Sequence, residues 1–395
     1  MKIHLKLHDI MNRLLVTCIM AAMAVCSWAF DFVHGPYLQN LTDTEVSMVW
    51  VTDEPSVGWV ELAPQGTDSY YSVPRPRYYD TDCGVKRTTR VHVVKITGLK
   101  PGTTYRYRAY STLVTGHNVN KVYYGETKAT NPYTTHTFTT SDNSRTKINF
   151  AVVNDIHEDN QKLTNLIGMC DLKTTDFFIF NGDMTSAFND EKQVFAGFMD
   201  TACKLFASNI PSYYVRGNHE TRGNFSTEFH KYFNPTQNKI YYSFRYGPVF
   251  FIMLDTGEDK PDTDIEYYGI TDYDNYRTEQ AEWLKKVVAS DDYKNAPFKV
   301  VIAHMPPRSA DQKGWHGEVD LNEKIVPVLN DAKPDIMICA HLHRYMFHKP
   351  DANVQFPYMV NSNKAIVKVE VDGNTMKLTD TDLEGKVVDT YTVKK

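Results

Sequence analysis

Five short apolar runs, each closed by a small cluster of His, Asp or Asn residues, constrain the fold of this 395-residue chain more than any other feature. The runs cover residues 148–153, 176–180, 212–215, 299–302 and 335–339 and are rich in Val, Ile, Phe and Tyr, which predicts buried strands. In open α/β sheets, side chains at the carboxyl ends of neighbouring strands meet in one crevice. We therefore expect the following clusters to converge: Asp155 and His157; Asp183; Asn218, His219 and Glu220; His304; His341 and His343.

These clusters contain side chains that bind transition metals. Imidazole, carboxylate and amide oxygen ligands without cysteine suit Zn, Mn or Fe, and one shared carboxylate can hold two ions ~3.5–4 Å apart. A single His in a loop is more often structural than catalytic. Separate structural explanations for seven candidate ligands at successive strand ends are improbable, so the sequence predicts a site for two divalent ions.

Over residues 147–347 these motifs, in this order, resemble the calcineurin-like metallophosphoesterase superfamily. The resemblance implies two metal positions that share Asp183 as the bridge: one with Asp155, His157 and His343, and one with Asn218, His304 and His341. It also implies that a metal-bridging hydroxide attacks a phosphate ester in line. His219 is then the residue that stabilises the transition state and protonates the leaving group, so His219 and Asp183 are the expected catalytic residues.

The first part of the chain has a different pattern, with short alternating runs and frequent turn residues. Strands are expected at 45–51, 57–62, 89–96, 104–110 and 135–139, which is typical of a small β-sandwich. Residues 96–108, with Leu99-Lys-Pro101-Gly102 at the turn, resemble a fibronectin type III module. Together with the segment 35–39 they also resemble the N-terminal domain of purple acid phosphatases, and we place this domain at 30–141.

The polar segment 141–146 separates this sandwich from the first ligand-bearing strand. Beyond it, strands alternate with helical stretches at 161–169, 192–206, 278–290 and 322–329, which predicts an α/β layered domain. The tail from 364 to 393 returns to hairpin-like strands that complete a second sheet. The resemblance implies a four-layer αββα sandwich for residues 147–395.

The N-terminus reads as an export signal. Lys2, Lys6 and Arg13 precede an apolar run at 14–25, and Ser27-Trp28-Ala29 places small residues at a cleavage site, so we expect cleavage after Ala29 and a periplasmic or extracellular protein. The run is shorter than the roughly 20 residues of a membrane span. A retained N-terminal anchor is the alternative, and we expect no membrane span after cleavage.

Charge and cysteine content limit the partners and the covalent framework. The net charge of −5 gives no indication of a basic nucleic-acid-binding surface. Cys83, Cys170, Cys203 and Cys339 follow the expected cleavage site, too few for a disulfide scaffold of this length. A single bridge between Cys170 and Cys203 remains open at this point.

The expected metal site departs from that of purple acid phosphatases. Those enzymes carry Asp-x-Gly in the first motif and a Tyr three residues after the bridging Asp, and the tyrosinate binds ferric iron and gives the colour. Here the first motif ends in His157, and Ser186 stands three residues after Asp183. The sequence therefore predicts a colourless enzyme with two divalent ions.

Substrate contacts are expected from the loop after the fourth run and from the residue after His343. Arg308, His316 and Arg344 are the candidates for phosphate binding, each with an ordinary loop or surface role as the alternative. Glu220 either orients the loop beside Asn218 or is a solvated surface carboxylate.

These features predict an exported metal-dependent phosphoesterase, most simply a phosphomonoesterase acting on small or peptide-borne phosphate esters. A phosphodiesterase or nuclease with the same dinuclear site is the first alternative, since His157 also occurs at this position in diesterases. A non-catalytic protein that binds a partner through its sandwich is the second, and the complete ligand set argues against it.

Overall fold

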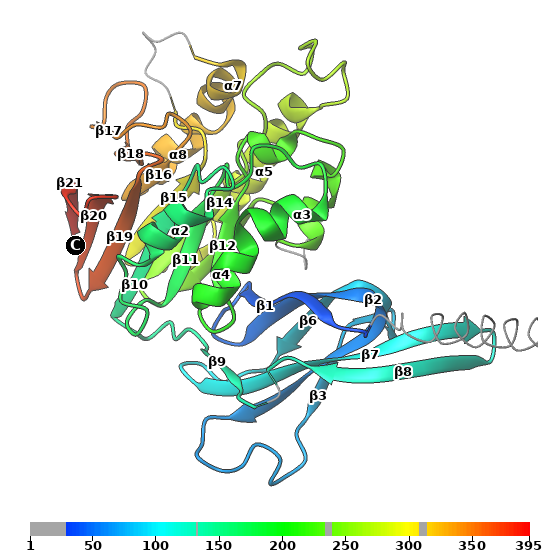
Figure 1. Cartoon of the computed structure of the whole chain (residues 1–395). Helices are drawn as coiled ribbons and strands as arrows, with labels where there is room; N and C mark the ends of the chain where they lie inside the picture. The colour runs from blue at the N-terminus through cyan, green and yellow to red at the C-terminus, as the bar shows by residue number, and fades with distance from the viewer. Residues whose placement is uncertain (1–28, 132, 234–238, 308–313) are drawn as a thin grey trace, which may run out of the picture.

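A computed structural model of the chain describes residues 29–131, 133–233, 239–307 and 314–395. Almost all of the expected export signal, and Arg308, therefore lie outside the described residues. Within these ranges no helix is both long enough and apolar enough to cross a membrane. Figure 1 shows a β-sandwich packed beneath a larger domain in which helices flank two sheets.

The N-terminal domain is a β-sandwich held together by one long strand. Its strands are β1 (Phe32–Gln39), β2 (Glu45–Pro64), β3 (Arg77–Tyr79), β4 (Thr81–Asp82), β5 (Val85–Lys86), β6 (Thr88–Thr97), β7 (Thr104–Asn118), β8 (Lys121–Ala129) and β9 (His136–Thr139). The first half of β2 pairs with β1 and β6, and the second half pairs with β3 and β7. The register breaks between Val51 and Ser56, where the strand passes from one layer to the other. The sequence indicated two separate strands here, and the structure joins them.

The second domain contains two six-stranded sheets. The first has the order β12 (Ser212–Val215), β11 (Phe177–Asn181), β10 (Lys147–Val153), β19 (Ala365–Asp372), β20 (Thr375–Asp382) and β21 (Val387–Lys394). The second has the order β13 (Tyr242–Tyr246), β14 (Val249–Leu254), β15 (Phe298–Ala303), β16 (Ile336–Cys339), β18 (Tyr358–Val360) and β17 (Met346–His348). All five predicted ligand-bearing strands are present, whereas β13 and β14 were not expected.

Alternate residues of the central strands explain the layering. On β10, Ile148, Phe150 and Val152 lie in the core between the two sheets, while Ala151 and Val153 face the helices outside. Because both faces are buried, these strands are apolar throughout. The layers run helices, sheet, sheet, helices, and the predicted four-layer fold class is confirmed.

Helices cover the outer face of each sheet. Those on the first sheet are α2 (Asn160–Ile167) and a continuous helical segment of α3 (Glu191–Val194), η1 (Phe195–Met199), α4 (Asp200–Ala202) and η2 (Cys203–Ala207). Those on the second sheet's side are α5 (Tyr273–Val288), α6 (Asp291–Asn295), α7 (His316–Lys324) and α8 (Val326–Ala332). Two short turns, η3 (His219–Thr221) and η4 (Ser226–Lys231), follow β12. Cys170 and Cys203 are free thiols, so the bridge left open by the sequence is not formed.

Buried tyrosines cross the interface between the two domains. The hydroxyl of Tyr37 on β1 donates to the carbonyl of Tyr232, and that of Tyr107 on β7 donates to the carbonyl of Ser208 at 2.6 Å. In the opposite direction, Tyr213 on β12 donates to the carbonyl of Leu41. Each tyrosine ring is almost fully buried, so the contacts fix the sandwich against the amino ends of the central strands.

One carboxylate inside the C-terminal hairpins has no stabilising partner. Asp380 on β20 is fully buried, and neither of its oxygens has a hydrogen-bond partner among the described residues. It pairs across the sheet with Val367 on one side and Asp389 on the other. Burial, followed by the negative charges of Asp389 and Asp382, raises the pKa of Asp380 to about 7.

This raised pKa predicts a pH-dependent loss of stability. An unfolded Asp ionises near pH ~3.9, so the free energy of unfolding falls as pH rises from there through the folded pKa of about 7. Asp380→Asn removes the ionisation, and its stability relative to wild type should increase by about 2 kcal/mol between pH 5 and pH 8. Urea denaturation at both pH values measures this difference.

Glu384→Gln, at an exposed turn between the same strands, serves as the control and should follow the wild-type pH profile. Parallel profiles for Asp380→Asn and wild type would show that Asp380 is ionised in both states.

Candidate metal centre

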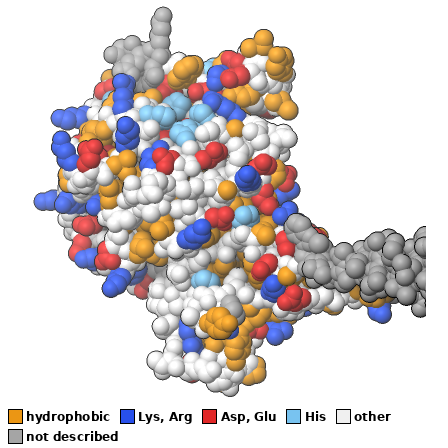
Figure 2. Space-filling model, viewed as in Figure 1, with side chains coloured by type: hydrophobic (Ala, Val, Ile, Leu, Met, Phe, Trp, Pro, Cys, Tyr) orange, Lys and Arg blue, Asp and Glu red, His pale blue; other side chains and the backbone are white. Residues whose placement is uncertain are grey.

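The predicted ligands lie at the carboxyl ends of five strands from both sheets. Asp155 and His157 follow β10, Asp183 follows β11, and Asn218 follows β12, all from the first sheet. In the second sheet, His304 follows β15, while His341 and His343 follow β16. β10, β11 and β12 are parallel, as are β15 and β16, so the ligand-bearing ends of each sheet point in the same direction. In Figure 2, histidine side chains gather at the end of the second domain that lies away from the sandwich.

The side chains form two overlapping groups that suit two ions. One consists of Asp155, His157, Asp183 and His343, and the other of Asp183, His304 and His341, with the ligand atoms of each group within 4.8 Å of one another. The amide oxygen of Asn218 lies 3.1 Å from Nδ1 of His341, beside the second group. The structure thus brings all seven predicted ligands together, with Asp183 common to both groups.

The backbone at the ligands adopts a conformation that side chains disfavour. Five of the ligands have φ in the left-handed region: Asp155 (50°), His157 (49°), Asp183 (51°), His341 (71°) and His343 (54°). Such residues are uncommon outside Gly and Asn, and they concentrate at functional sites. Gly182, next to Asp183, cannot carry a side chain, because a Cβ there would approach Nδ1 of His304 to 2.4 Å.

Two buried polar atoms in this cluster lack a suitable protein partner. Among the described residues, Oδ1 of Asp155 and Nε2 of His304 have no hydrogen bond of acceptable geometry. Nε2 of His304 lies 3.1 Å from Oδ2 of Asp183, and Nε2 of His343 lies 3.0 Å from Oδ1 of Asp155. Buried donors and acceptors left in this state are costly, and a cation between them satisfies the lone pairs. The residues therefore fit a dinuclear metal site.

Electrostatics favour positive charge at the shared carboxylate. Burial opposes ionisation of Asp183, but His304 and His219 hold its pKa below the ordinary value. Burial likewise opposes a charged His304, yet the Asp183 carboxylate outweighs it and raises the pKa of His304 to about 10. Burial instead lowers the pKa of His341 to about 4, which keeps this imidazole neutral, as metal coordination requires.

Asn181 joins the two sheets directly beneath the ligands. Its Nδ2 donates to the carbonyls of Ala303 on β15 (3.1 Å) and Ile338 on β16 (3.3 Å). Its own carbonyl accepts from Nδ1 of His304 at 2.7 Å, which directs Nε2 of that ring towards Asp183. The sequence offered a signal that was not used, a polar residue at the end of an apolar strand.

Two further amide side chains, those of Asn154 and Asn361, orient Asp155. Nδ2 of Asn154 donates to Oδ2 of Asp155 at 2.7 Å, and Nδ2 of Asn361 donates to Oδ1 of Asn154 at 2.6 Å. The backbone N–H of His341 donates to the same Asp155 oxygen at 3.2 Å. Oδ2 is thereby occupied, and Oδ1 remains for a metal.

Glu220 is buried and organises the loops that carry the ligands. Its Oε2 accepts from the backbone N–H groups of Asp183 and Gly217, both at 2.9 Å. Its Oε1 accepts from the N–H of Thr185 at 3.1 Å and from the hydroxyl of Tyr214 at 3.0 Å. Of the two roles open for Glu220, the loop-orienting one is therefore correct.

His219 faces the same cluster from η3. Its Nδ1 lies 2.8 Å from the carbonyl of Ser186, so Nδ1 carries the donated proton. Nε2 lies 3.9 Å from Oδ2 of Asp183, and the ring centroid is 4.8 Å from that of His157. The ring thus presents Nε2 to the space beside the expected metal positions.

Of the three predicted substrate residues, the structure describes His316 and Arg344. His316 begins α7, and its Nε2 lies 2.7 Å from Oδ1 of Asp274. Arg344 is exposed next to His343. Neither belongs to the two candidate metal groups, and Arg308 lies outside the described residues.

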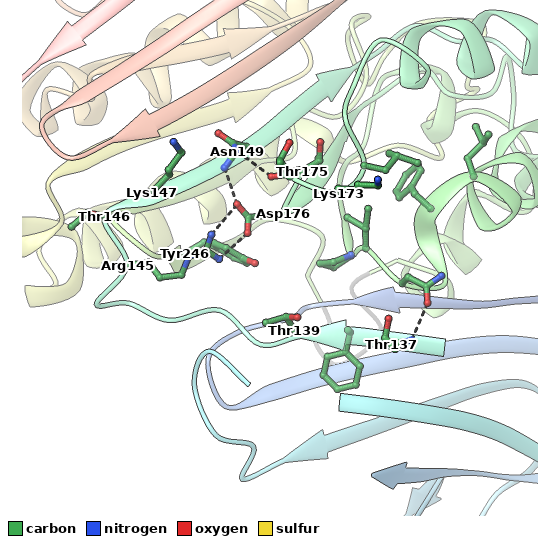
Figure 3. Close-up of a pocket in the computed structure, with 18 of the residues that line it drawn as sticks. Thr137, Thr139, Arg145, Thr146, Lys147, Asn149, Lys173, Thr175, Asp176 and Tyr246 are labelled. Carbon is green, nitrogen blue, oxygen red and sulfur yellow. Dashed lines mark hydrogen bonds and ion pairs between the residues drawn. The ribbon is translucent and has the colours of Figure 1, made fainter. Parts of the chain in front are cut away.

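A wide groove between the domains is not part of this site. It has a volume of about 950 Å³ and lies between β9 and the amino ends of β10 and β11, at the opposite edge of the sheet from the ligands. Figure 3 shows Arg145 and Asp176 paired at its wall, with Lys147 and Lys173 nearby. Neither candidate metal group contributes a residue to its lining.

Comparison with known proteins agrees with this geometry. Residues 148–345, about half of the chain, match the family described as calcineurin-like phosphoesterase. The chain belongs to the calcineurin-like phosphoesterase family. Residues 35–114 match the N-terminal domain of purple acid phosphatases, so the predicted family and fold class are confirmed.

The family relatives include plant enzymes. Purple acid phosphatase 21 of Arabidopsis thaliana is 26% identical over 278 residues, which are 67% of this chain and 54% of the relative. Purple acid phosphatase 15 of the same plant is 24% identical over 277 residues, which are 65% of this chain and 49% of the relative. The chain thus spans about half the length of these curated relatives.

A solved family structure shares the fold. Purple acid phosphatase PPD1 from yellow lupin (Lupinus luteus) seeds gives a TM-score of 0.64 at 18% identity, covering 91% of this chain and 74% of that chain. The family match and the shared fold place the two candidate metal groups in a calcineurin-like phosphoesterase domain.

The role of Glu220 can be tested by Glu220→Gln. A glutamine offers one acceptor oxygen, and its NH₂ group would face two protein donors, so we expect a loss of about 2–3 kcal/mol in the free energy of unfolding and weaker metal retention. Urea denaturation and metal analysis of the purified protein measure both. Glu228→Gln, at a surface pair with Lys231, should change stability by less than ~0.5 kcal/mol. Wild-type stability and metal content in Glu220→Gln would contradict the organising role.

Proposed function

We propose that this protein is an exported phosphomonoesterase that works with two divalent metal ions. The observation that supports the proposal most strongly is the pair of overlapping ligand groups that share Asp183. Two divalent ions held there would lower the pKa of a bound water and neutralise the anionic phosphoryl group. Asn154, Asn181 and Glu220 fix the loops and side chains that would hold these ions.

His219 is the proposed proton donor to the leaving alkoxide. The Ser186 carbonyl holds Nδ1 as a donor, so a second proton must reside on Nε2, which faces the cluster. An imidazole is a common general acid, and from this position Nε2 can donate its proton to the departing alkoxide oxygen.

The metals are proposed to be divalent and the enzyme colourless. Ser186 occupies the position at which purple acid phosphatases carry their metal-binding Tyr, and its Oγ lies 3.5 Å from Nδ1 of His157. A neutral imidazole in the first group favours a trivalent ion less than a phenolate does. Zn, Mn and Fe(II) all suit this ligand set.

Export is supported by the N-terminal pattern of basic, apolar and small residues. Mass determination of the N-terminus of protein recovered outside the cytoplasm should show that the chain begins at Phe30. A full-length N-terminus would indicate the retained anchor instead.

The proposed activity can be tested with two model esters. The metal-loaded protein should hydrolyse p-nitrophenyl phosphate faster than bis(p-nitrophenyl) phosphate, and Asp183→Asn should lower both rates by ~100-fold or more, because the shared ligand is weakened. Asp351→Asn makes the same chemical change at a surface His–Asp contact (3.8 Å) and should leave both rates unchanged. Faster turnover of the diester would favour the phosphodiesterase alternative. No turnover of either ester with Zn, Mn or Fe would contradict the proposal.

A further inference from the structure

Arg222, just after η3, is held in one orientation by buried carboxylates. Its Nε lies 3.1 Å from Oε2 of Glu258, and its Nη2 lies 3.0 Å from Oε1 of the same side chain. Nη2 also lies 3.3 Å from Oδ1 of Asp259, and the Tyr267 hydroxyl accepts from Nε at 3.1 Å. Glu258 is fully buried, so this two-point pairing fixes the plane of the guanidinium.

The pairing leaves the remaining nitrogen of Arg222 directed at the metal cluster. Nη1 lies 3.5 Å from Nε2 of His219, and no carboxylate or carbonyl of the described residues accepts a hydrogen bond from it. Nε2 of His219 in turn lies 3.9 Å from Oδ2 of the shared ligand Asp183. Arg222 and His219 are both partly open to solvent, with exposed side-chain fractions of 23% and 29%.

We propose that Nη1 of Arg222 and Nε2 of His219 form a two-donor clamp for the phosphoryl group of a phosphomonoester. This inference rests on the proposed function and adds a substrate-contacting residue to it. Nη1 of Arg222 is a donor, and Nε2 of His219 is a donor when it carries the proton that the proposed function assigns to it. The two nitrogens lie 3.5 Å apart, which suits two oxygens of one tetrahedral phosphate, and a bound anion would replace their contact with each other.

The clamp depends on direction more than on net charge. Glu258 and Asp259 compensate the charges of Arg222 and Lys260 around this point, so the guanidinium contributes oriented N–H groups. Lysine has a single ammonium group and cannot hold Glu258 at two points while reaching towards His219. A monoester has three terminal oxygens and a diester has two, so a diester has fewer oxygens to share between the metal positions and the clamp and gains less from the clamp.

The experiment compares Arg222→Lys and Arg222→Met with Lys260→Met in the metal-loaded protein. Lys260 is a matched control, because it contacts the same Glu258 and Asp259 with a similar exposed fraction, 21%, and its other ion pair is to Glu266. We would measure kcat/KM for p-nitrophenyl phosphate and bis(p-nitrophenyl) phosphate, and the Kd of inorganic phosphate by calorimetry. Metal content and melting temperature would be recorded for each variant.

Both Arg222 variants should lose about tenfold or more in kcat/KM for the monoester and in phosphate affinity, with a smaller loss for the diester. Lys260→Met should stay within about twofold of wild type. Wild-type values in Arg222→Lys and Arg222→Met, with metal content intact, would overturn the clamp. An equal loss in Lys260→Met, or a loss that tracks melting temperature, would also overturn it.

The calorimetric arm separates the two proposals. If the wild-type protein turns over neither ester, the proposed function fails, but phosphate binding still reports on the clamp. Phosphate binding that is lost in Arg222→Lys and kept in Lys260→Met would support the clamp in a non-catalytic protein, and equal binding in all variants would reject it.

Discussion

The metal centre depends on one amide that joins two sheets. Ligands arise from both sheets, which pack face to face through an apolar core, and each ligand follows the carboxyl end of its strand. Asn181 satisfies a carbonyl on each of two strands of the second sheet while its own carbonyl sets the ring of His304. Because an unpaired buried amide or carbonyl is costly, this geometry tolerates little sliding between the sheets. The distance between the two halves of the ligand set is therefore fixed before any metal binds.

The site stores conformational strain around this fixed frame. Several ligand residues lie in the left-handed backbone region, and two buried ligand atoms have no partner of suitable geometry among the residues that the structure describes. Glu220 offsets part of this cost by accepting three hydrogen bonds from backbone N–H groups of these loops and one from the hydroxyl of Tyr214 on β12. Stability is thus concentrated in the strands and the surrounding polar network, while the ligands are held in the arrangement that cations require.

The sequence predicted those strands and ligands whose pattern lies within a short stretch of the chain. The ligand-bearing strands were recognised because an apolar run and a metal-binding residue adjoin in the chain, and the resemblance then ordered the ligands. β13 and β14 were missed because they carry no ligand, although Val249–Leu254 is fully buried. Glu220 accepts a hydrogen bond from the loop at Asp183, and Arg222 pairs with Glu258. In both cases the partner lies far away along the chain. No local pattern reports such pairings, and neither did the sequence indicate that one strand, β2, passes through both layers of the sandwich.

The tyrosines at the domain boundary should keep the two domains together after proteolytic cleavage between them. Tyr37, Tyr107 and Tyr213 each bury a ring on one side and donate a hydrogen bond to a backbone carbonyl on the other. A protease that cuts the polar segment at 141–146 would sever the covalent link but leave these contacts in place. The two fragments should remain associated as a nicked but folded protein, since separation would expose apolar rings and leave carbonyls without donors. The sandwich would therefore stay bound to the second domain as a folded unit even without the covalent link between them.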